Sequence, residues 1–403
     1  MIARKRLDIG WSDLAFAVAA CAGLVRAPRT TRPLLTRRAD SLVCLSVRSG
    51  FDLLLTELAW PAGSEVLVSA ITIPDIPRIL REHGLVPVPV DVDPETLAVD
   101  EAMLARVCSP RTRAVLVAHL FGARSPMDGI VAFAQARGLM VLEDCAQAFV
   151  ANEFAGDAHS DVRMFSFGPI KTATALGGGV LLVNDAALLA RLRRRQAGWP
   201  PQPTGAFLRR VLKLGFFKPL VGAWIYGPLV AALHTLGRNH DEIVTRAGRG
   251  FAGGNFFARL RHRPCAALVL LLERRLTTYE RQRVVARAAA GERVLAALGN
   301  VRPIGARALG RTHWLFPLRV AERENLMRQL WREGFDATCA SSSLYTLPAE
   351  AGQEPAHAAE AAMASVLYVP VYSEMTAAQL DRLAARVNAL ARPPARVADY
   401  ARR

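Results

Sequence analysis

The sequence predicts an α/β protein whose main sheet is mostly parallel. From residue 41 to about residue 190, short apolar runs alternate with stretches of helical periodicity, which is typical of successive strand and helix units. The runs are rich in Val and Leu and lack polar alternation, as expected for strands that are buried on both faces. A similar alternation over the last hundred residues predicts a second, smaller α/β domain.

In the first of these domains we predict five strands and four helices. The helices are expected after Gly50, over 74–83 and 127–137, and from Asp185 through the arginine run that follows. The strands are expected at 65–68, 86–90, 114–118, 139–142 and 179–183.

The regular pattern stops at 199–254, where prolines are followed by an apolar and basic stretch. Beyond it we expect one long helix over 264–298, then a strand at 314–320, a helix at 323–333, a strand at 366–371 and a helix at 376–390. The chain therefore divides into an N-terminal helical segment (1–40), a large α/β domain (41–198), an apolar basic insertion (199–254), and a long helix with the small domain (255–403).

The composition is that of a folded protein. Hydrophobic residues make up 52% of the 403 residues and charged residues 21%, with a mean hydropathy of +0.19, which excludes global disorder. No uninterrupted apolar run reaches the roughly 20 residues of a membrane-spanning helix, and acids at Asp8 and Asp13 do not suit a signal peptide. We therefore expect a cytoplasmic protein. The six cysteines form no C-x-x-C pair, so we expect neither a metal site nor a disulfide framework.

The positive charge is concentrated in one segment. The formal net charge is +16, and fourteen basic residues with only two acids between Arg191 and Arg263 hold +12 of it. Such an excess suggests an anionic partner. Because the rest of the chain is nearly balanced, we expect no nucleic-acid-binding face.

Residues 141–185 place polar side chains next to predicted strands. Asp144 follows a buried strand at the carboxyl edge, where parallel sheets bind their ligands, and Gln147, Ser166 and Lys171 come after it. Only four of the 51 basic residues are lysine. A lysine amine can lose its proton and form a Schiff base, whereas a guanidinium cannot. Lys171 is therefore a candidate nucleophile, and the alternative is a surface lysine that escaped replacement by arginine.

With these motifs the chain resembles the DegT/StrS-type family of pyridoxal-phosphate (PLP) sugar aminotransferases, a branch of the aspartate aminotransferase fold. The resemblance runs from SVRSG at 46–50 to Leu390 and is broken chiefly by the insertion. Its strongest motifs are HLFG at 119–122, EDCAQ at 143–147 and FSFGPIK at 165–171. It implies the PLP-dependent transferase fold of type I, with a mostly parallel central sheet of the seven-stranded type.

The resemblance also implies roles for single residues. Lys171 would hold PLP as a Schiff base and act as the base that moves the proton during transfer. Asp144 would pair with the pyridine nitrogen and keep it protonated, and Gln147 would contact the 3-hydroxyl side of the ring.

The phosphate of the cofactor would bind at the start of a helix. Ser166 would contact it together with the backbone amides of Ser49, Gly50 and Phe51, because helix N-termini favour anions. Phe51 stands where the family commonly has Thr, so one phosphate hydroxyl is absent.

A second departure concerns the pyridine ring. The family usually stacks an aromatic residue on it, but residues 70–75 contain none. Ile73 or Pro74 is therefore expected to cover the ring.

Three further residues are candidates for contacts with a neighbouring subunit or a substrate. Asn255 resembles a family segment that reaches the neighbour's phosphate site, which implies a homodimer, although Phe257 stands where the family has arginine. The alternative for Asn255 is a helix cap. His119 and His313 lie in matching stretches and are candidates for orienting a substrate, with hydrogen bonds inside the fold as the alternative.

The implied activity is amino transfer, expected from glutamate, to a keto-sugar nucleotide or a related carbonyl compound, including a lipid-linked one. A PLP enzyme of another type, a dehydratase or lyase, is an alternative. Some related dehydratases replace the Schiff-base lysine by histidine, so the presence of Lys171 argues against that branch. Another alternative is a membrane-associated sensor or scaffold with a PLP fold.

The insertion carries an uncharged run at 219–233. As a helix it would span about 22 Å, which is shorter than the roughly 30 Å hydrocarbon core of a bilayer. Two interpretations stay open: a hairpin that covers the core or a subunit contact, or an interfacial element facing a bilayer. Trp224 and Tyr226 favour the second, in which residues 205–236 make the protein peripheral at the inner face of the membrane.

Overall fold

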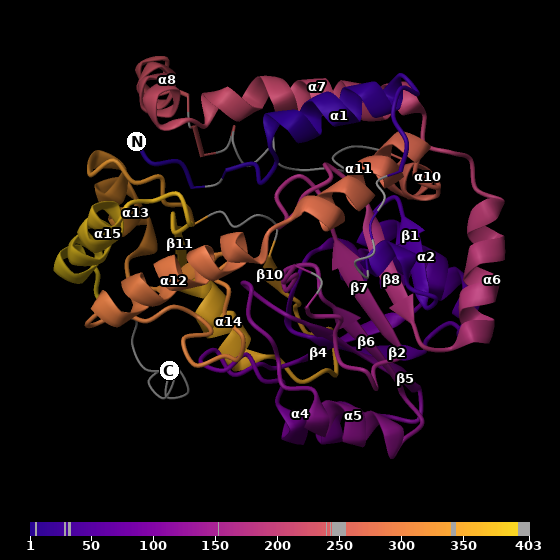
Figure 1. Ribbon diagram of the computed structural model, residues 1–403. Coiled ribbons are helices and arrows are strands. Elements are labelled where there is room, and N and C mark those ends of the chain that lie inside the picture. Colours follow the sequence, from indigo (N-terminus) through magenta and orange to yellow (C-terminus); the bar gives the residue numbers. More distant parts are fainter. Residues whose placement is uncertain are drawn as a thin grey trace.

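A seven-stranded sheet lies at the centre of the molecule (Figure 1). The computed structural model describes residues 1–4, 6–27, 30, 34–151, 153–238, 240–241, 243, 255–339 and 344–393. The strand order is β1-β8-β7-β6-β5-β2-β4. The strands are β1 (Ser41–Cys44), β2 (Glu65–Ser69), β4 (Val86–Val90), β5 (Thr112–Ala118), β6 (Met140–Asp144), β7 (Val162–Ser166) and β8 (Gly179–Val183).

The sheet is mostly parallel, as the sequence predicts. Strands β4, β2, β5, β6 and β7 pair in parallel, whereas β8 runs antiparallel to both of its neighbours, β7 and β1. All five predicted strands are present. The pattern misses β1, which has only four residues, and β7, whose apolar run is interrupted by Arg163.

Both faces of the sheet are buried. Along β5, Ala114 and Leu116 enter one core, while Val115 and Val117 enter another, as the alternation of side chains along a strand requires. The first core is covered by α2 (Val47–Leu58), α3 (Asp75–Glu82) and α6 (Ala186–Ala197), and the second by α4 (Glu101–Val107) and α5 (Asp128–Gln135).

Helix α2 begins earlier than the sequence analysis expects. Ser46 is its N-cap: the Ser46 Oγ accepts a hydrogen bond from the Ser49 amide at 3.1 Å, and the Gly50 amide donates to the Ser46 carbonyl at 3.0 Å. A serine cap of this kind fixes the start of a helix. The predicted start after Gly50 is therefore wrong by about one turn.

A further layer of helices covers the sheet beside β7 and β8. It consists of α11 (Ala266–Thr278) with α7 (Thr204–Leu220) and α1 (Trp11–Cys21), which pack against one another (Figure 1). None of the described helices is alone long and apolar enough to cross a bilayer. One pair, Thr204–Leu220 with Ile225–Leu233, meets the length and composition of a span only when joined across a bend of 93°.

The single long helix predicted over 264–298 is in fact two helices. Between α11 and α12 (Arg281–Ala297), Tyr279 adopts an extended conformation with φ −71° and ψ 120°. Its ring is buried and its hydroxyl donates to Asp8 Oδ2 at 2.8 Å. This contact with a distant segment explains why local periodicity does not show the break.

The small domain is built around an antiparallel pair of strands, β9 (Phe316–Arg319) and β11 (Val366–Val369). Both strands lie inside the ranges predicted for them. The surrounding helices are α12, α13 (Arg323–Arg332), α14 (His357–Ala364) and α15 (Ala377–Leu390). A second short pair, β3 (Ile71–Thr72) with β10 (Tyr345–Thr346), joins this domain to the large one.

A buried polar cluster attaches the insertion to the small domain. Asp336 accepts hydrogen bonds from Arg4 at 2.6 Å and from the hydroxyl of Tyr226, on α8 (Ala223–Thr235), at 2.5 Å. Burial alone would raise the pKa of Asp336, but hydrogen bonds from His240, Arg4 and Tyr226 outweigh it and hold this pKa at about 2. Tyr226 therefore faces the protein interior and is not the interfacial aromatic that the sequence suggests.

Candidate active site

The candidate site lies at one edge of the sheet, where several chain segments meet. The carboxyl ends of β5, β6 and β7 point to this edge, and β1 runs in the same direction because β8 reverses twice between them. Side chains that directly follow these strands are therefore brought together although they are distant in sequence.

Lys171 lies in the loop after β7 and is half-buried. Its Nζ is 4.3 Å from the centre of the Trp314 ring, and the Trp314 Nε1 donates to the carbonyl of Ile170 at 3.2 Å. Burial lowers the pKa of Lys171 to about 8, against the opposing attraction of Asp144 and with a further contribution from the cation of Arg48. Because a lower pKa leaves more free amine at neutral pH, this lysine is suited to attack a carbonyl group.

Arg48 connects two segments at the edge. It lies in the first turn of α2, and its Nε donates to Asp75 at the start of α3. Arg48 lies in the SVRSG motif at 46–50, and no role is predicted for it from the sequence. Its nearness to Lys171 could not be found from spacing, since 123 positions separate them.

Asp144 and Gln147 lie on the turn after β6. Asp144 Oδ1 accepts from the Ala146 amide at 2.9 Å, and within the described residues its carboxylate has no ion-pair partner. Gln147 is buried, and its Oε1 accepts from the Phe121 amide at 2.8 Å. This bond fixes the amide of Gln147 so that its NH₂ group is the end left to donate.

The residues predicted to bind the phosphate, Ser49, Gly50 and Phe51, lie in the first two turns of α2. The first amides of a helix have no partner within it, and here they belong to Val47 and Arg48. Ser49 and Gly50 already use their amides inside the helix cap. Phe51 is fully buried in the core under α2. The amides of Ser49 and Gly50 thus serve the helix itself, and phosphate binding at this helix start stays a prediction.

Ser166 and three consecutive glycines at 177–179 border this helix start. The hydroxyl of Ser166, at the end of β7, has no hydrogen-bond partner among the described residues. A Cβ on Gly179, the residue that pairs with Ser166, would lie 2.5 Å from the Val47 nitrogen. Glycine is thus required at this position to let β8 approach the first turn of α2.

Both candidate histidines make hydrogen bonds inside the fold. His119 Nδ1 accepts from the Ser125 amide at 3.0 Å, and its Nε2 lies 2.7 Å from Glu143 Oε2. His313 Nε2 lies 2.8 Å from Glu292 Oε1, on α12. Burial lowers the pKa of His313 below its ordinary value. This geometry favours the alternative in which these side chains hold the fold together.

Asn255 is exposed and begins α10 (Phe256–Leu260) with a left-handed φ of 59°. Its side chain makes no capping hydrogen bond, so the structure does not support the helix-cap alternative. It borders a surface hollow of about 670 Å³ that is also lined by Arg78 and Phe256.

Taken together, these groups fit a pyridoxal phosphate. The site offers a half-buried amine of lowered pKa and an amide donor. Within the described part of the chain it also offers a carboxylate without an ion-pair partner and a free hydroxyl beside a helix N-terminus. These groups suit the ring nitrogen and the phosphate of a PLP cofactor.

The chain belongs to the DegT/DnrJ/EryC1/StrS aminotransferase family, whose model matches residues 36–388. Members of this family depend on PLP. The predictions of family, fold and cofactor are thereby confirmed.

The relatives differ in sequence identity to this chain and in the share of the chain that they match. The chain is 26% identical over 367 residues to the GDP-perosamine synthase of Caulobacter vibrioides, covering 86% of this chain and 85% of the relative. It is 37% identical over 166 residues to a UDP-N-acetyl-3-dehydro-alpha-D-glucosamine 3-aminotransferase of Acidithiobacillus ferrooxidans, covering 40% and 45%. With that relative and similar ones, the match thus spans less than half of their length.

A solved structure shows the same fold. The aminotransferase TlmJ from Streptoalloteichus hindustanus superimposes with a TM-score of 0.69 at 19% identity, covering 96% of this chain and 98% of that one.

We expect the rate at which the cofactor-free protein captures PLP to rise with pH around a midpoint near 8. The free amine is the reactive form, and burial lowers the pKa of Lys171 to about 8. At pH 7 this gives roughly 300-fold more free amine than an ordinary lysine has. The rate can be followed by absorbance after mixing with PLP.

The Arg48→Gln variant should move this midpoint to higher pH, because it removes a cation that lowers the pKa of Lys171. Arg81→Gln is the matched control, since Arg81 is exposed and pairs with Glu350. A wild-type midpoint near 10.5, or an equal shift in both variants, would contradict the assignment.

Proposed function

We propose that the protein is a PLP-dependent aminotransferase that moves an amino group from an amino acid, expected to be glutamate, to the ketone of a sugar nucleotide or a related carbonyl compound. The observation that carries this proposal is the half-buried amine of Lys171, with a pKa of about 8, at the sheet edge that also holds Asp144 and Gln147. The family membership and the printed activities of the relatives support it.

Each side chain has a defined task in this proposal. The cofactor, when bound, supplies an electron sink for the carbon that exchanges its amino group. Lys171 holds the cofactor and moves the proton at that carbon. Asp144 places a negative charge at the ring nitrogen, and Gln147 donates from its fixed amide.

The phosphate contacts come from a different set of elements. Ser166 contributes its hydroxyl, and Val47 and Arg48 contribute the first amides of α2. Arg48 also brings a positive charge to the anion. This charge can compensate for the hydroxyl that the family commonly has at the position of Phe51.

A single-turnover experiment tests the reaction without knowledge of the ketone. The PLP-loaded protein mixed with glutamate should release about one equivalent of 2-oxoglutarate, and Lys171→Ala should release none. Asp144→Asn should keep the cofactor but react roughly 10²- to 10³-fold more slowly, the usual cost of removing one preorganised electrostatic contact.

The outcome also separates the alternatives. Bound PLP that releases no 2-oxo acid from any member of a panel of amino acids would favour a sensor or scaffold. Borohydride reduction that places the cofactor on Lys213 or Lys218 would contradict the role of Lys171. If the first step succeeds, the ketone named for the relative of Acidithiobacillus ferrooxidans is a first acceptor to try.

We propose further that two copies of the chain form the active unit. Asn255 is exposed and makes no capping bond. Arg261 attaches the segment after Asn255 to α2, the phosphate-site helix, through Nε to Asp52 Oδ2 at 3.0 Å. A side chain so placed can complete the site of a neighbour.

Mixed dimers test this arrangement. Lys171→Ala and Asn255→Ala should each be nearly inactive alone, and their mixture should recover part of the activity, because one hybrid site contains both native residues. Arg259→Ala serves as a control for changes near Asn255. No recovery in verified heterodimers would mean that each site is built from one chain.

The insertion is proposed to contact an anionic membrane surface, although by other residues than the aromatic pair predicted. Tyr226 is buried, and the side chain of Trp224 lies outside what the structure describes. On α7, however, Leu212 and Phe216 are 56% and 71% exposed. Exposed Arg209 and Lys213 share their helix face, because the four residues follow the spacing of three and four positions that aligns side chains on a helix.

Vesicle flotation tests this contact. The wild type should float with anionic vesicles and less so at high salt, since the charge term is screened. The variant Leu212→Glu/Phe216→Glu should lose binding, because it removes apolar contact worth about 25 cal/mol per Å². Leu309→Glu is the matched control, being 60% exposed on another part of the surface.

Two outcomes would dismiss the membrane contact. One is a wild type that stays with the soluble fraction. The other is a double variant that floats as well but loses its dimer, which would identify this face of α7 as a subunit contact.

A further inference from the structure

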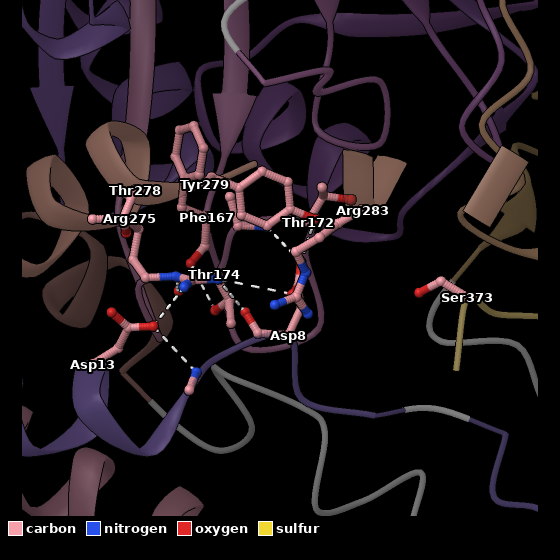
Figure 2. A network of polar contacts seen from close by, with 12 residues as sticks. Asp8, Asp13, Phe167, Thr172, Thr174, Arg275, Thr278, Tyr279, Arg283 and Ser373 are labelled. Carbon is pink, nitrogen blue, oxygen red and sulfur yellow. Dashed lines mark hydrogen bonds and ion pairs between the residues drawn. The ribbon is translucent and has the colours of Figure 1, made fainter. Parts of the chain in front are cut away.

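The segment before α1 touches the loop that carries Lys171. Asp8 Oδ2 accepts a hydrogen bond from the backbone amide of Ala173 at 2.9 Å. Ala173 lies two residues after Lys171 and is fully buried. Figure 2 shows the carboxylate of Asp8 among side chains from the loop and from the helices behind it.

The carboxylate of Asp8 is itself held from several sides. Tyr279 donates to its Oδ2 at 2.8 Å and Arg283 to its Oδ1 at 2.6 Å. Arg275 donates to the backbone carbonyl of Asp8 at 2.6 Å. These three donors come from α11, α12 and the break between them, so the position of Asp8 is fixed by the helical layer.

Arg275, which binds the backbone of Asp8, also binds the loop directly. Arg275 Nε donates to the carbonyl of Thr174 at 3.1 Å, next to Ala173, while its Nη1 donates to Asp13 Oδ2 at 2.5 Å (Figure 2). Asp8, Asp13 and Arg275 thus form one unit that joins the N-terminal segment to the loop.

The loop needs such partners because its backbone is unusual. Ala173 has a φ of 53° and Leu176 a φ of 61°, and residues with a Cβ are disfavoured in this left-handed region. Bonds inside the loop hold its ends: Lys171 N donates to the Gly168 carbonyl at 3.0 Å, and Ala175 N to the Phe167 carbonyl at 3.0 Å. The amide of Ala173, between them, is held by Asp8.

Asp8 accepts a hydrogen bond from the loop, whereas the other side chains that contact the loop from outside donate to it. Trp314, Arg287 and Arg275 donate to oxygens of the loop. Within the described residues, Asp8 is the only acceptor outside 167–176 that binds a backbone amide of 168–176. Its removal would leave a buried amide without a partner, which favours a change of the loop conformation.

We propose that Asp8 is a positioning residue for Lys171, which sets the direction of the amine by fixing the turn at Ala173. It does not touch the reacting atoms. This inference rests on the proposed function for the identity of Lys171 as the cofactor lysine, but the hydrogen bond to Ala173 stands independently of it. A displacement of catalytic groups by about 1 Å can cost up to 100-fold in rate.

Hydrogen exchange of the PLP-loaded protein tests whether Asp8 fixes the turn at Ala173. In Asp8→Ala, peptides that contain Ala173 should exchange at least tenfold faster than in the wild type. In Asp8→Asn the exchange should stay near that of the wild type, since the amide oxygen can still accept. Glu273→Ala is the matched control, because it removes an ion pair of α11 with Arg37 at 2.8 Å and leaves the loop alone.

Single-turnover kinetics over a range of glutamate concentrations, which need no ketone, test whether Asp8 affects the reaction. Asp8→Ala should lower the maximal rate of 2-oxoglutarate release (kcat of this half-reaction) by roughly ten- to 100-fold, while the half-saturating glutamate concentration (KM) changes less than twofold. Asp8→Asn should recover most of kcat. Glu273→Ala should leave both values unchanged. A general loss of stability would instead lower activity in Asp8→Ala and Glu273→Ala alike.

Three outcomes would overturn the proposal: unchanged exchange at Ala173 in folded Asp8→Ala, equal effects in Glu273→Ala, or faster exchange without any change of kcat. If Asp8→Ala does not fold, Tyr279→Phe takes its place and should raise exchange at Ala173 to a smaller extent, because it removes one donor to the same oxygen. If the protein does not transfer amino groups but shows these exchange rates, the proposed function is contradicted. The role of Asp8 in holding the Ala173 amide would then still be supported.

Discussion

The site depends on the direction of the strands in the central sheet. In the parallel register, Ala118 on β5 pairs with Asp144 on β6, which in turn pairs with Met164 on β7. The residues that follow each strand therefore leave the sheet at the same level. Strand β8 is antiparallel to both β7 and β1, so β1 runs in the same direction as β7. Helix α2, which follows β1, therefore begins at the same edge. A shift of one residue in any of these pairs would turn Asp144 towards the other face.

The electrostatic environment of Lys171 is a balance between burial and charge. Burial and the cation of Arg48 favour the neutral amine, while Asp144 favours the charged form. Asp75 holds Arg48 by an ion pair, which limits where that cation can go. The pKa of the amine is thus controlled by groups on α2, α3 and β6, each placed by a different crossover of the sheet.

Local patterns in the sequence predict the parts of this structure that depend on local physics. Buried strands are visible as apolar runs, and Asp144 is found because it follows such a run. Lys171 is found because lysine is scarce in this chain. The start of α2 is missed because Ser46, not the glycine, caps the helix. The residues that the motif resemblance assigns to the phosphate, Ser49, Gly50 and Phe51, lie inside this helix.

Long-range contacts are what the patterns cannot predict. Trp314 comes next to Lys171 only after the small domain has packed against the large one. Tyr226 resembles an interfacial aromatic in sequence, yet its hydroxyl is drawn inward by Asp336, 110 positions away. The break between α11 and α12 likewise involves a contact of Tyr279 with Asp8.

The scarcity of lysine has a practical consequence for digestion by a protease that cuts after lysine. With cuts after Lys5, Lys171, Lys213 and Lys218, the chain yields fragments 6–171 and 172–213. A cofactor reduced onto Lys171 blocks that cut and leaves the single fragment 6–213. The ratio of these fragments on a gel would then measure the fraction of cofactor-loaded chains without labelling or mutation.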